Sequence, residues 1–273
     1  MQSASRDALK ASRERLDSVA DGLTRDEVGR LAEDLLGVAG VLVREIPLRR
    51  ALSDPSRSGS DRSGLVERIF GPHVEAPALS VLTAMVAVRW SAPSDLVDAT
   101  EQLGVDALLI GAEEAGVLPE VEDELFRFSR IVDGHPGLAA ALADETATAE
   151  RRGALIDQLL EGKARPATVR LARLAVSGFG GRAFETALER LLELAAARRG
   201  RSVVRVRVAA PITEQQERGL GSALAAAYGR QVSLQVEVDE ALIGGAIVRI
   251  ESDLYDGSVA SRLAEARRRL TNL

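Results

Sequence analysis

The stretch Val232–Val259 reads VSLQVEVDEALIGGAIVRIESDLYDGSV, and it decides the fold of the C-terminal part of the chain. Apolar side chains fall at every second position at its start, with polar ones between them: Val232, Leu234, Val236 and Val238. This period of two, rich in β-branched residues, predicts a half-buried strand. A second strand is predicted at Ala246–Ile250. Gly244 and Gly245 directly precede this strand, and glycines there favour a positive φ, a bulge or a close backbone approach.

A turn and a last helix are expected after these strands. Asp256-Gly257-Ser258 has the composition of a turn, and Ser258 is a suitable N-cap residue. An apolar stripe follows at helical spacing: Val259, Leu263, Ala266 and Leu270. The last turn carries Arg267, Arg268 and Arg269, where the helix dipole favours cations.

The residues from 201 to 231 complete a small α/β domain at 201–273. Three valines alternate with arginines and predict a strand: Val204, Val206 and Val208 with Arg205 and Arg207. Thr213 and Gln216 predict a capping box for a helix that ends at Tyr228, with Gly229 in the C′ position. The expected order is strand, helix, strand, strand, short strand and helix.

The same C-terminal stretch carries a family resemblance. VDEALIGGAIVRI, followed by YDGSV and a helix that ends in RRRL, resembles the C-terminal signature of the delta subunit of F-type ATP synthases, the family of the mitochondrial oligomycin-sensitivity-conferring protein. The resemblance covers roughly residues 105–273, and the preceding hundred residues resemble the longer delta subunits of actinobacteria. The segment Ile250–Asp253 departs from the family, which usually has a glycine before the aspartate, so a local difference is expected at that turn.

The helical part of the chain repeats itself at an offset of 90 residues. The charged pair Glu33-Asp34 recurs as Asp123-Glu124, and Asp54 recurs as Asp144. Apolar positions keep the same register over some sixty residues, for example Leu48, Leu52, Val66 and Val86 against Leu138, Leu142, Ile156 and Val176. The pattern favours an internal duplication of a helical module over a chance alignment of two amphipathic stretches.

The fold class expected is therefore mainly α: a duplicated helical module followed by the small α/β domain. The first module is assigned to 1–104, and the second, at 105–200, should be a six-helix bundle like the family's N-terminal domain. Its helices are expected at Asp106–Ala115, Pro119–Val132, Leu138–Ala143, Ala147–Leu160, Pro166–Ser177 and Arg182–Arg198. In the first module, Asp54–Gly64 is predicted to be a loop from its composition, and one continuous helix from about Ser94 to Ala115 should cross Gly104 and join the modules.

Composition excludes several classes of site. Hydrophobic residues make up 46% and aromatic residues 3%, so the core is built from aliphatic side chains, and the net charge of −6 argues against a general nucleic-acid binder. Cysteine is absent and histidine occurs only twice, as His73 and His135. No apolar run approaches the ~20 residues of a membrane span. We expect no catalytic residues, no metal site and no cofactor.

Short motifs are interpreted structurally. Gly178-Phe179-Gly180-Gly181 has the G-x-x-G spacing of an RNA-binding loop, but it lies between two predicted bundle helices and favours a plain turn. No phosphate-binding loop sequence is present, so we expect no ATP binding. Asp239, Asp253 and Asp256 are interpreted as turn residues rather than metal ligands. Trp90 is expected in the core, both histidines at the surface, and the arginines between Arg198 and Arg207 on a solvated face.

The sequence is compatible with two alternative functions. The resemblance implies a non-catalytic stator subunit that ties the catalytic head of a proton-translocating ATP synthase to its membrane-anchored stalk. Its partners would be the alpha subunit N-terminus and b-type stalk subunits, with one copy in each complex, at the cytoplasmic face of the plasma membrane and without insertion into the bilayer. The alternative is an RNA- or ribosome-associated helical adaptor, suggested by the arginine-rich strand and the G-x-x-G. Net acidity and few aromatics count against it.

The resemblance also implies a place for the alpha subunit segment, between the first and fifth helices of the second module. Those helices are rich in small residues, which let another helix approach. The predicted partner-binding residues are Leu109, Ala112, Ala115, Ala172 and Ala175. The equally weighted alternative is that these alanines are ordinary contacts inside the bundle.

Overall fold

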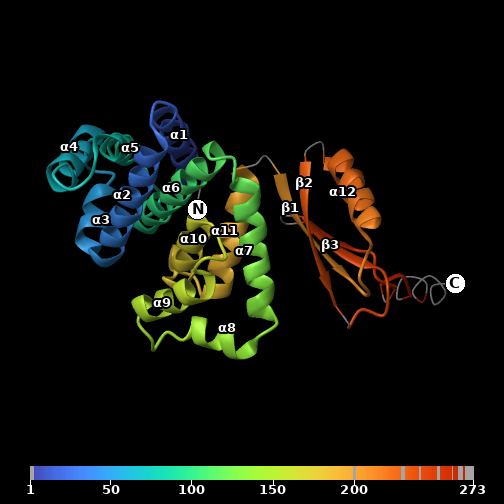
Figure 1. Cartoon of the computed structure of the whole chain (residues 1–273). Helices are drawn as coiled ribbons and strands as arrows, with labels where there is room; N and C mark the ends of the chain where they lie inside the picture. Colours follow the sequence, from blue (N-terminus) through green and yellow to red (C-terminus); the bar gives the residue numbers. More distant parts are fainter. Residues whose placement is uncertain are drawn as a thin grey trace. The chain divides into compact units, whose positions relative to one another are not determined.

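The computed structural model describes residues 3–198, 201–228, 231–239, 241–250, 253–259, 261–263 and 267. It divides into two compact units, Met1–Leu192 and Glu193–Leu273. The helices (Figure 1) are α1 Ser3–Ala20, α2 Arg25–Arg44, α3 Ile46–Leu52, α4 Gly59–Phe70, α5 Ala76–Ala87, α6 Pro93–Glu114, α7 Leu118–Asp133, α8 Pro136–Ala143, α9 Ala149–Leu160, α10 Pro166–Val176, the 3-10 turn η1 Phe179–Gly181, α11 Phe184–Arg198 and α12 Glu214–Tyr228. The strands are β1 Arg201–Val208, β2 Gln231–Val238, β3 Ala246–Ile250 and β4 Asp253–Asp256.

The duplication is confirmed by hydrogen bonds that recur at the same offset. Helix α4 spans 59–70 and α9 spans 149–160, which is a shift of 90 at both ends. The Asp54 carboxylate accepts from the backbone N–H of Ser56, and Asp144 accepts from that of Thr146, each at 2.9 Å. Asp34 accepts from the N–H of Glu75, and the equivalent Glu124 from that of Arg165. Chance alignment of apolar positions would not reproduce these side-chain-to-backbone contacts.

The predicted loop at Asp54–Gly64 is wrong in its second half. Helix α4 already begins at Gly59, because the Ser58 hydroxyl caps it by accepting from the N–H of Asp61 at 3.1 Å. Serine and glycine are common in loops, which is why a loop was predicted. Here Ser58 is instead the N-cap residue at which the helix begins. Thr24 and Glu27 have the spacing of a capping box, and they form one at the start of α2, where the N–H of Thr24 donates to the Glu27 carboxylate at 2.7 Å.

The continuous helix across Gly104 is confirmed by α6, which runs without a break from Pro93 to Glu114. Its first half closes the first repeat and its second half opens the second. Gly104 is buried against α2, where an added Cβ would lie 2.6 Å from Cγ of Leu36 and 3.2 Å from its backbone nitrogen. The glycine therefore sets how closely α2 and α6 approach.

This close approach leads to a prediction about Gly104→Ala. Alanine is the better helix former by about 1 kcal/mol, but the methyl group would push α6 away from α2, at a cost of about 1–3 kcal/mol for an overpacked core. We expect a net loss of stability in urea denaturation. Gly37→Ala on α2 is the control, because its Cβ would meet nothing within 4 Å, and it should stabilise the protein. A more stable Gly104→Ala variant would show that the contact is loose.

The C-terminal unit is a four-stranded mixed sheet in the order β2-β1-β3-β4. Strand β1 is parallel to β2 and antiparallel to β3, and the buried Val206 lies between Val236 and Val248 in register. Leu220 and Leu224 of α12 pack on this apolar face together with Leu234 and Val236. Where the side chains are described, the predicted alternation is confirmed: Val206 and Val208 are buried, Leu234 and Val236 are half-buried, and Arg207 and Glu237 are exposed. The exception is Val238 at the end of β2, which is 41% exposed.

The two predicted caps of this unit are also confirmed. The N–H of Thr213 donates to Gln216 at 2.8 Å, and Ser258 accepts from the N–H of Ser261 at 3.2 Å. Gly245 has a φ of 84°, as its place before β3 predicted. Of the last helix's apolar stripe, Val259 and Leu263 are 37% and 61% exposed. Other residues named in the predictions for this unit lie outside the described residues: Gly229, Glu251, Ser252, Ala266, Arg268, Arg269 and Leu270.

Candidate functional site

A groove of about 860 Å³ opens between α2, α6 and the start of α10. The side formed by α6 and its C-cap is apolar, with one leucine and otherwise small residues: Ala107, Leu108, Gly111, Ala112 and Ala115. The adjacent Leu109 and Ile110 are buried in the core. The floor of the groove is therefore a low apolar surface that can receive side chains from another chain.

Charged side chains form the two other walls of this groove. Helix α2 contributes Arg25, Asp26, Arg30 and Glu33, and the start of α10 contributes Arg165 and Arg170. Arg170 and Glu33 join the two walls through a bidentate ion pair, with Nε of Arg170 2.7 Å from Oε1 of Glu33. Such paired geometry holds a guanidinium and a carboxylate in one orientation.

The predicted partner-binding residues separate into two groups. Ala112 and Ala115 line the groove. Leu109, Ala172 and Ala175 are buried in the bundle, with exposed fractions of 0%, 0% and 1%. These three residues could affect partner binding by setting how α6 and α10 pack. Direct contact between them and a partner stays a prediction.

The α2 wall of the groove was not among the predicted partner-binding residues. Its signal was present: Arg25, Asp26, Gly29, Arg30 and Glu33 recur at the spacing of one helix face, with no apolar residue among them. Such a face is usually solvated, and only the packing of α2 on α6 places it beside α10.

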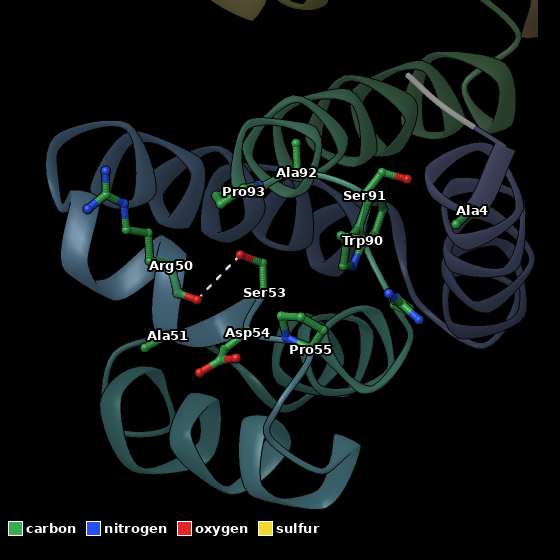
Figure 2. Close-up of a pocket in the computed structure, with 11 residues that line it drawn as sticks. Ala4, Arg50, Ala51, Ser53, Asp54, Pro55, Trp90, Ser91, Ala92 and Pro93 are labelled. Carbon is green, nitrogen blue, oxygen red and sulfur yellow. Dashed lines mark hydrogen bonds between the residues drawn. The ribbon is translucent and has the colours of Figure 1, made fainter.

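A second hollow, of about 640 Å³, lies in the first module between the end of α3 and the segment that leads into α6 (Figure 2). Its polar groups already have local partners. The Ser53 hydroxyl donates to the backbone oxygens of Arg49 and Arg50, and the Asp54 carboxylate caps its own turn. Trp90, which lines it, donates its indole N–H to the Met85 carbonyl at 2.8 Å and is 4% exposed, as expected for a core residue. This hollow therefore presents no convergent set of catalytic groups.

The G-x-x-G segment is a turn between α10 and α11, as predicted. Gly178, Gly180 and Gly181 all have a positive φ, and the N–H of Gly180 donates to the Glu101 carboxylate of α6 at 2.7 Å. Burial is the main cause that raises the pKa of Glu101; the neighbouring Asp98 adds to the rise, whereas the Gly180 N–H and Arg182 oppose it. One backbone donor thus only partly compensates for the lost hydration of this carboxylate.

The raised pKa of Glu101 predicts a pH-dependent effect of Glu101→Gln. A carboxyl group that binds its proton more tightly in the folded state loses stability as pH rises through that pKa. The amide keeps an acceptor for Gly180 but carries no charge. We expect the variant to gain stability over the wild type at neutral pH, and the gain to vanish near pH 4. Thermal unfolding across this pH range measures it, and a pH-independent difference would contradict the assignment.

The remaining motifs have structural roles. Asp239 accepts from the N–H of Ala241 and pairs with Arg207 at 3.1 Å, and Asp256 accepts from the N–H of Ser258. Among the residues that the structure describes, no three acidic or histidine side chains gather as metal ligands. His73 and His135 are exposed. Within the same ranges, none of the helices has the length and apolarity needed to cross a bilayer.

Comparison with known proteins identifies the family. A profile described as "ATP synthase delta (OSCP) subunit" matches residues 105–270. The chain belongs to the ATP synthase delta (OSCP) family. It is 52% identical to the ATP synthase subunit delta of Salinispora arenicola over 271 residues, which are 99% of each chain. It is 45% identical to that of Streptomyces avermitilis over 269 residues, 98% of each chain.

A solved structure is also similar, a chain of the cryo-EM structure of the Toxoplasma gondii mitochondrial ATP synthase hexamer. It shows 19% identity and a TM-score of 0.38, and the match covers 61% of this chain and 94% of that one.

Membership in the delta family confirms the resemblance seen in the C-terminal signature. The two delta relatives match nearly the whole chain, so they share the first hundred residues that precede the family profile. Delta subunits are non-catalytic parts of the ATP synthase, and the chain is accordingly a structural subunit rather than an enzyme. This finding favours the predicted role as a non-catalytic ATP synthase subunit over the alternative of an RNA-associated adaptor.

Proposed function

We propose that this chain is a stator subunit, which links the catalytic head of a proton-translocating ATP synthase to its membrane-anchored stalk. Family membership carries the proposal. Rotation of the central shaft exerts torque on the head, and a static tether keeps the head from turning with the shaft. The torque is then used for conformational change at catalytic sites on other subunits. This task needs stiffness and partner contacts rather than acid–base groups.

The first unit has a construction suited to such a tether. The 22-residue helix α6 belongs to both repeats, so bending between them would require breaking its backbone hydrogen bonds. Three side-chain contacts tie α6 or α2 to distant segments: Arg13 to Asp106, Glu101 to Gly180 and Glu33 to Arg170. These links supplement the apolar core and resist relative motion of the repeats.

The partners under this proposal are the N-terminal segment of the alpha subunit and the b-type stalk subunits, with one copy of this chain in each complex at the cytoplasmic face of the plasma membrane. The alpha segment would bind as an amphipathic helix in the groove along α6 and α10. Ala112 and Ala115 line that groove, and Ala115 is half-buried whereas Ala112 is 4% exposed, so Ala115 is the predicted residue with more surface left for direct contact.

The test is calorimetric binding of a synthetic peptide with the alpha subunit's N-terminal sequence to the full chain. Ala167→Trp would fill the groove from the α10 side, since Ala167 lines it and is half-buried. We expect at least a tenfold weaker affinity. Ala140→Trp, on the exposed surface of α8, is the control and should bind normally. Peptide affinity that is equal in both variants would place the binding site elsewhere.

A further inference from the structure

We propose that helix α2 of the first repeat is one wall of the partner groove, and that the groove selects an amphipathic helix with acidic residues beside its apolar stripe. The inference rests on the function proposed above and adds a role for the first module. Helix α2 lies before residue 105, where the match to the delta family profile begins. The wall is therefore specific to long chains of this kind.

The shape of the α2 wall supports a binding role. Gly29 of α2 and Gly111 of α6 both line the groove. A Cβ added at Gly29 would meet nothing within 4 Å, as at Gly37 on the same helix, so the α2 backbone at Gly29 is open to the groove. Glycine at such a place costs about 1 kcal/mol relative to alanine. Because Gly29 also lines the groove, an incoming helix can pass close to the α2 backbone there.

The width of the groove is fixed by contacts on either side of it. Further along α2, Leu36 packs tightly against Gly104 of α6. The ion pair between Glu33 and Arg170 then holds α2 to α10. Both contacts preform the groove, so a partner helix would bind without ordering its walls first, which lowers the entropic cost of association.

The charges on the walls indicate the chemistry of the partner. Four arginines and two carboxylates line the groove, an excess of two positive charges on a chain whose net charge is −6. Arg30 pairs with Glu75, and Arg170 pairs with Glu33. Arg25 on α2 and Arg165 at the start of α10 are exposed, and among the described residues neither side chain has an ion-pair partner. Two unpaired cations on opposite walls of an apolar floor are complementary to an acidic amphipathic helix.

Two substitutions on α2 test the inference in the full chain, with the alpha N-terminal peptide as the probe. Gly29→Leu should fill the groove from the α2 side and weaken binding at least tenfold. Gly37→Leu is the matched control, because Gly37 is exposed on the same helix, has the same free space and does not line the groove. Arg25→Glu should weaken binding at least threefold in low salt, and the loss should shrink as salt rises. Circular dichroism checks that each variant is folded.

The outcomes separate this inference from the function on which it rests. A wild-type chain that does not bind the peptide overturns both. Binding that survives Gly29→Leu or Arg25→Glu but is weakened by Ala167→Trp leaves the groove on α6 and α10 in place, and it overturns the role of α2. Weakening by both α2 variants, with the Gly37→Leu control unchanged, supports the composite groove.

Discussion

Arg62→Met is expected to destabilise the first repeat by about 3–5 kcal/mol, because several backbone carbonyls lose their donor at about 1–3 kcal/mol for each buried acceptor left unsatisfied. The Arg62 side chain is 6% exposed, and all its hydrogen bonds go to backbone carbonyls. Nε donates to Val86 at 2.7 Å, and the two Nη atoms donate to a set of four: Asp54, Arg57, Ala87 and Val88. Three of these carbonyls terminate α5, where the helix dipole favours a cation.

The duplication supplies the matched control for Arg62. Arg152 occupies the equivalent position 90 residues later, but its Nη1 makes a hydrogen bond of 3.3 Å to Leu142, and its buried Nε has no partner. Arg152→Met should therefore cost far less, about 1 kcal/mol for one weak hydrogen bond. Because both sites lose an arginine and gain the same methionine, the difference between the two losses in unfolding free energy measures the contribution of the carbonyl network.

Urea denaturation followed by fluorescence measures the Arg62 effect. Trp90 is the only tryptophan of the chain, and its indole N–H binds the Met85 carbonyl, one residue before the first Arg62 contact. Its emission therefore reports on the first repeat directly. Equal costs for Arg62→Met and Arg152→Met would mean that the carbonyl network adds nothing to stability.

Gly245→Val is the second substitution with a large expected effect, and it concerns the C-terminal unit. Gly245 has a φ of 84°, and an added Cβ would lie 2.5 Å from the carbonyl oxygen of Gly257. A β-branched residue with a positive φ is strained wherever it occurs. The clash is with backbone, so no side-chain rotation relieves it. We expect a loss of at least about 3 kcal/mol, the sum of strain and overpacking.

The damage from Gly245→Val should be confined to its own unit. Two backbone hydrogen bonds join the residues on either side of Gly245 to the following turn: the N–H of Val259 donates to Gly244 at 2.9 Å, and that of Gly257 donates to Ala246 at 3.0 Å. Hydrogen exchange of the β1 and β3 amides should accelerate, while Trp90 fluorescence stays unchanged. The control is Gly219→Ala in α12, which meets nothing within 4 Å and should be neutral or stabilising. Unchanged exchange in Gly245→Val would show that the turn can open without cost.

The sequence by itself determined the elements and their boundaries wherever a local interaction sets them. The alternation in β1 and β2, the capping boxes at Thr24 and Thr213, and the positive φ of Gly245 each depend on a few neighbouring residues, so they could be predicted. The duplication and the continuous α6 could also be predicted, because the repeated register of apolar positions is visible in the sequence alone. Family resemblance then identified the chain as a delta subunit.

The tertiary structure determined which helix faces pack against each other and which remain open to a partner. Periodicity shows that a helix has a buried side but not which helix covers it, so Leu109, Ala172 and Ala175 were predicted as partner contacts although the bundle buries them. The same reason hid the groove: the charged face of α2 resembles an ordinary solvated surface in sequence. Only the packing of Leu36 on Gly104 brings that face beside α10 and makes three helices, from both repeats, line one groove.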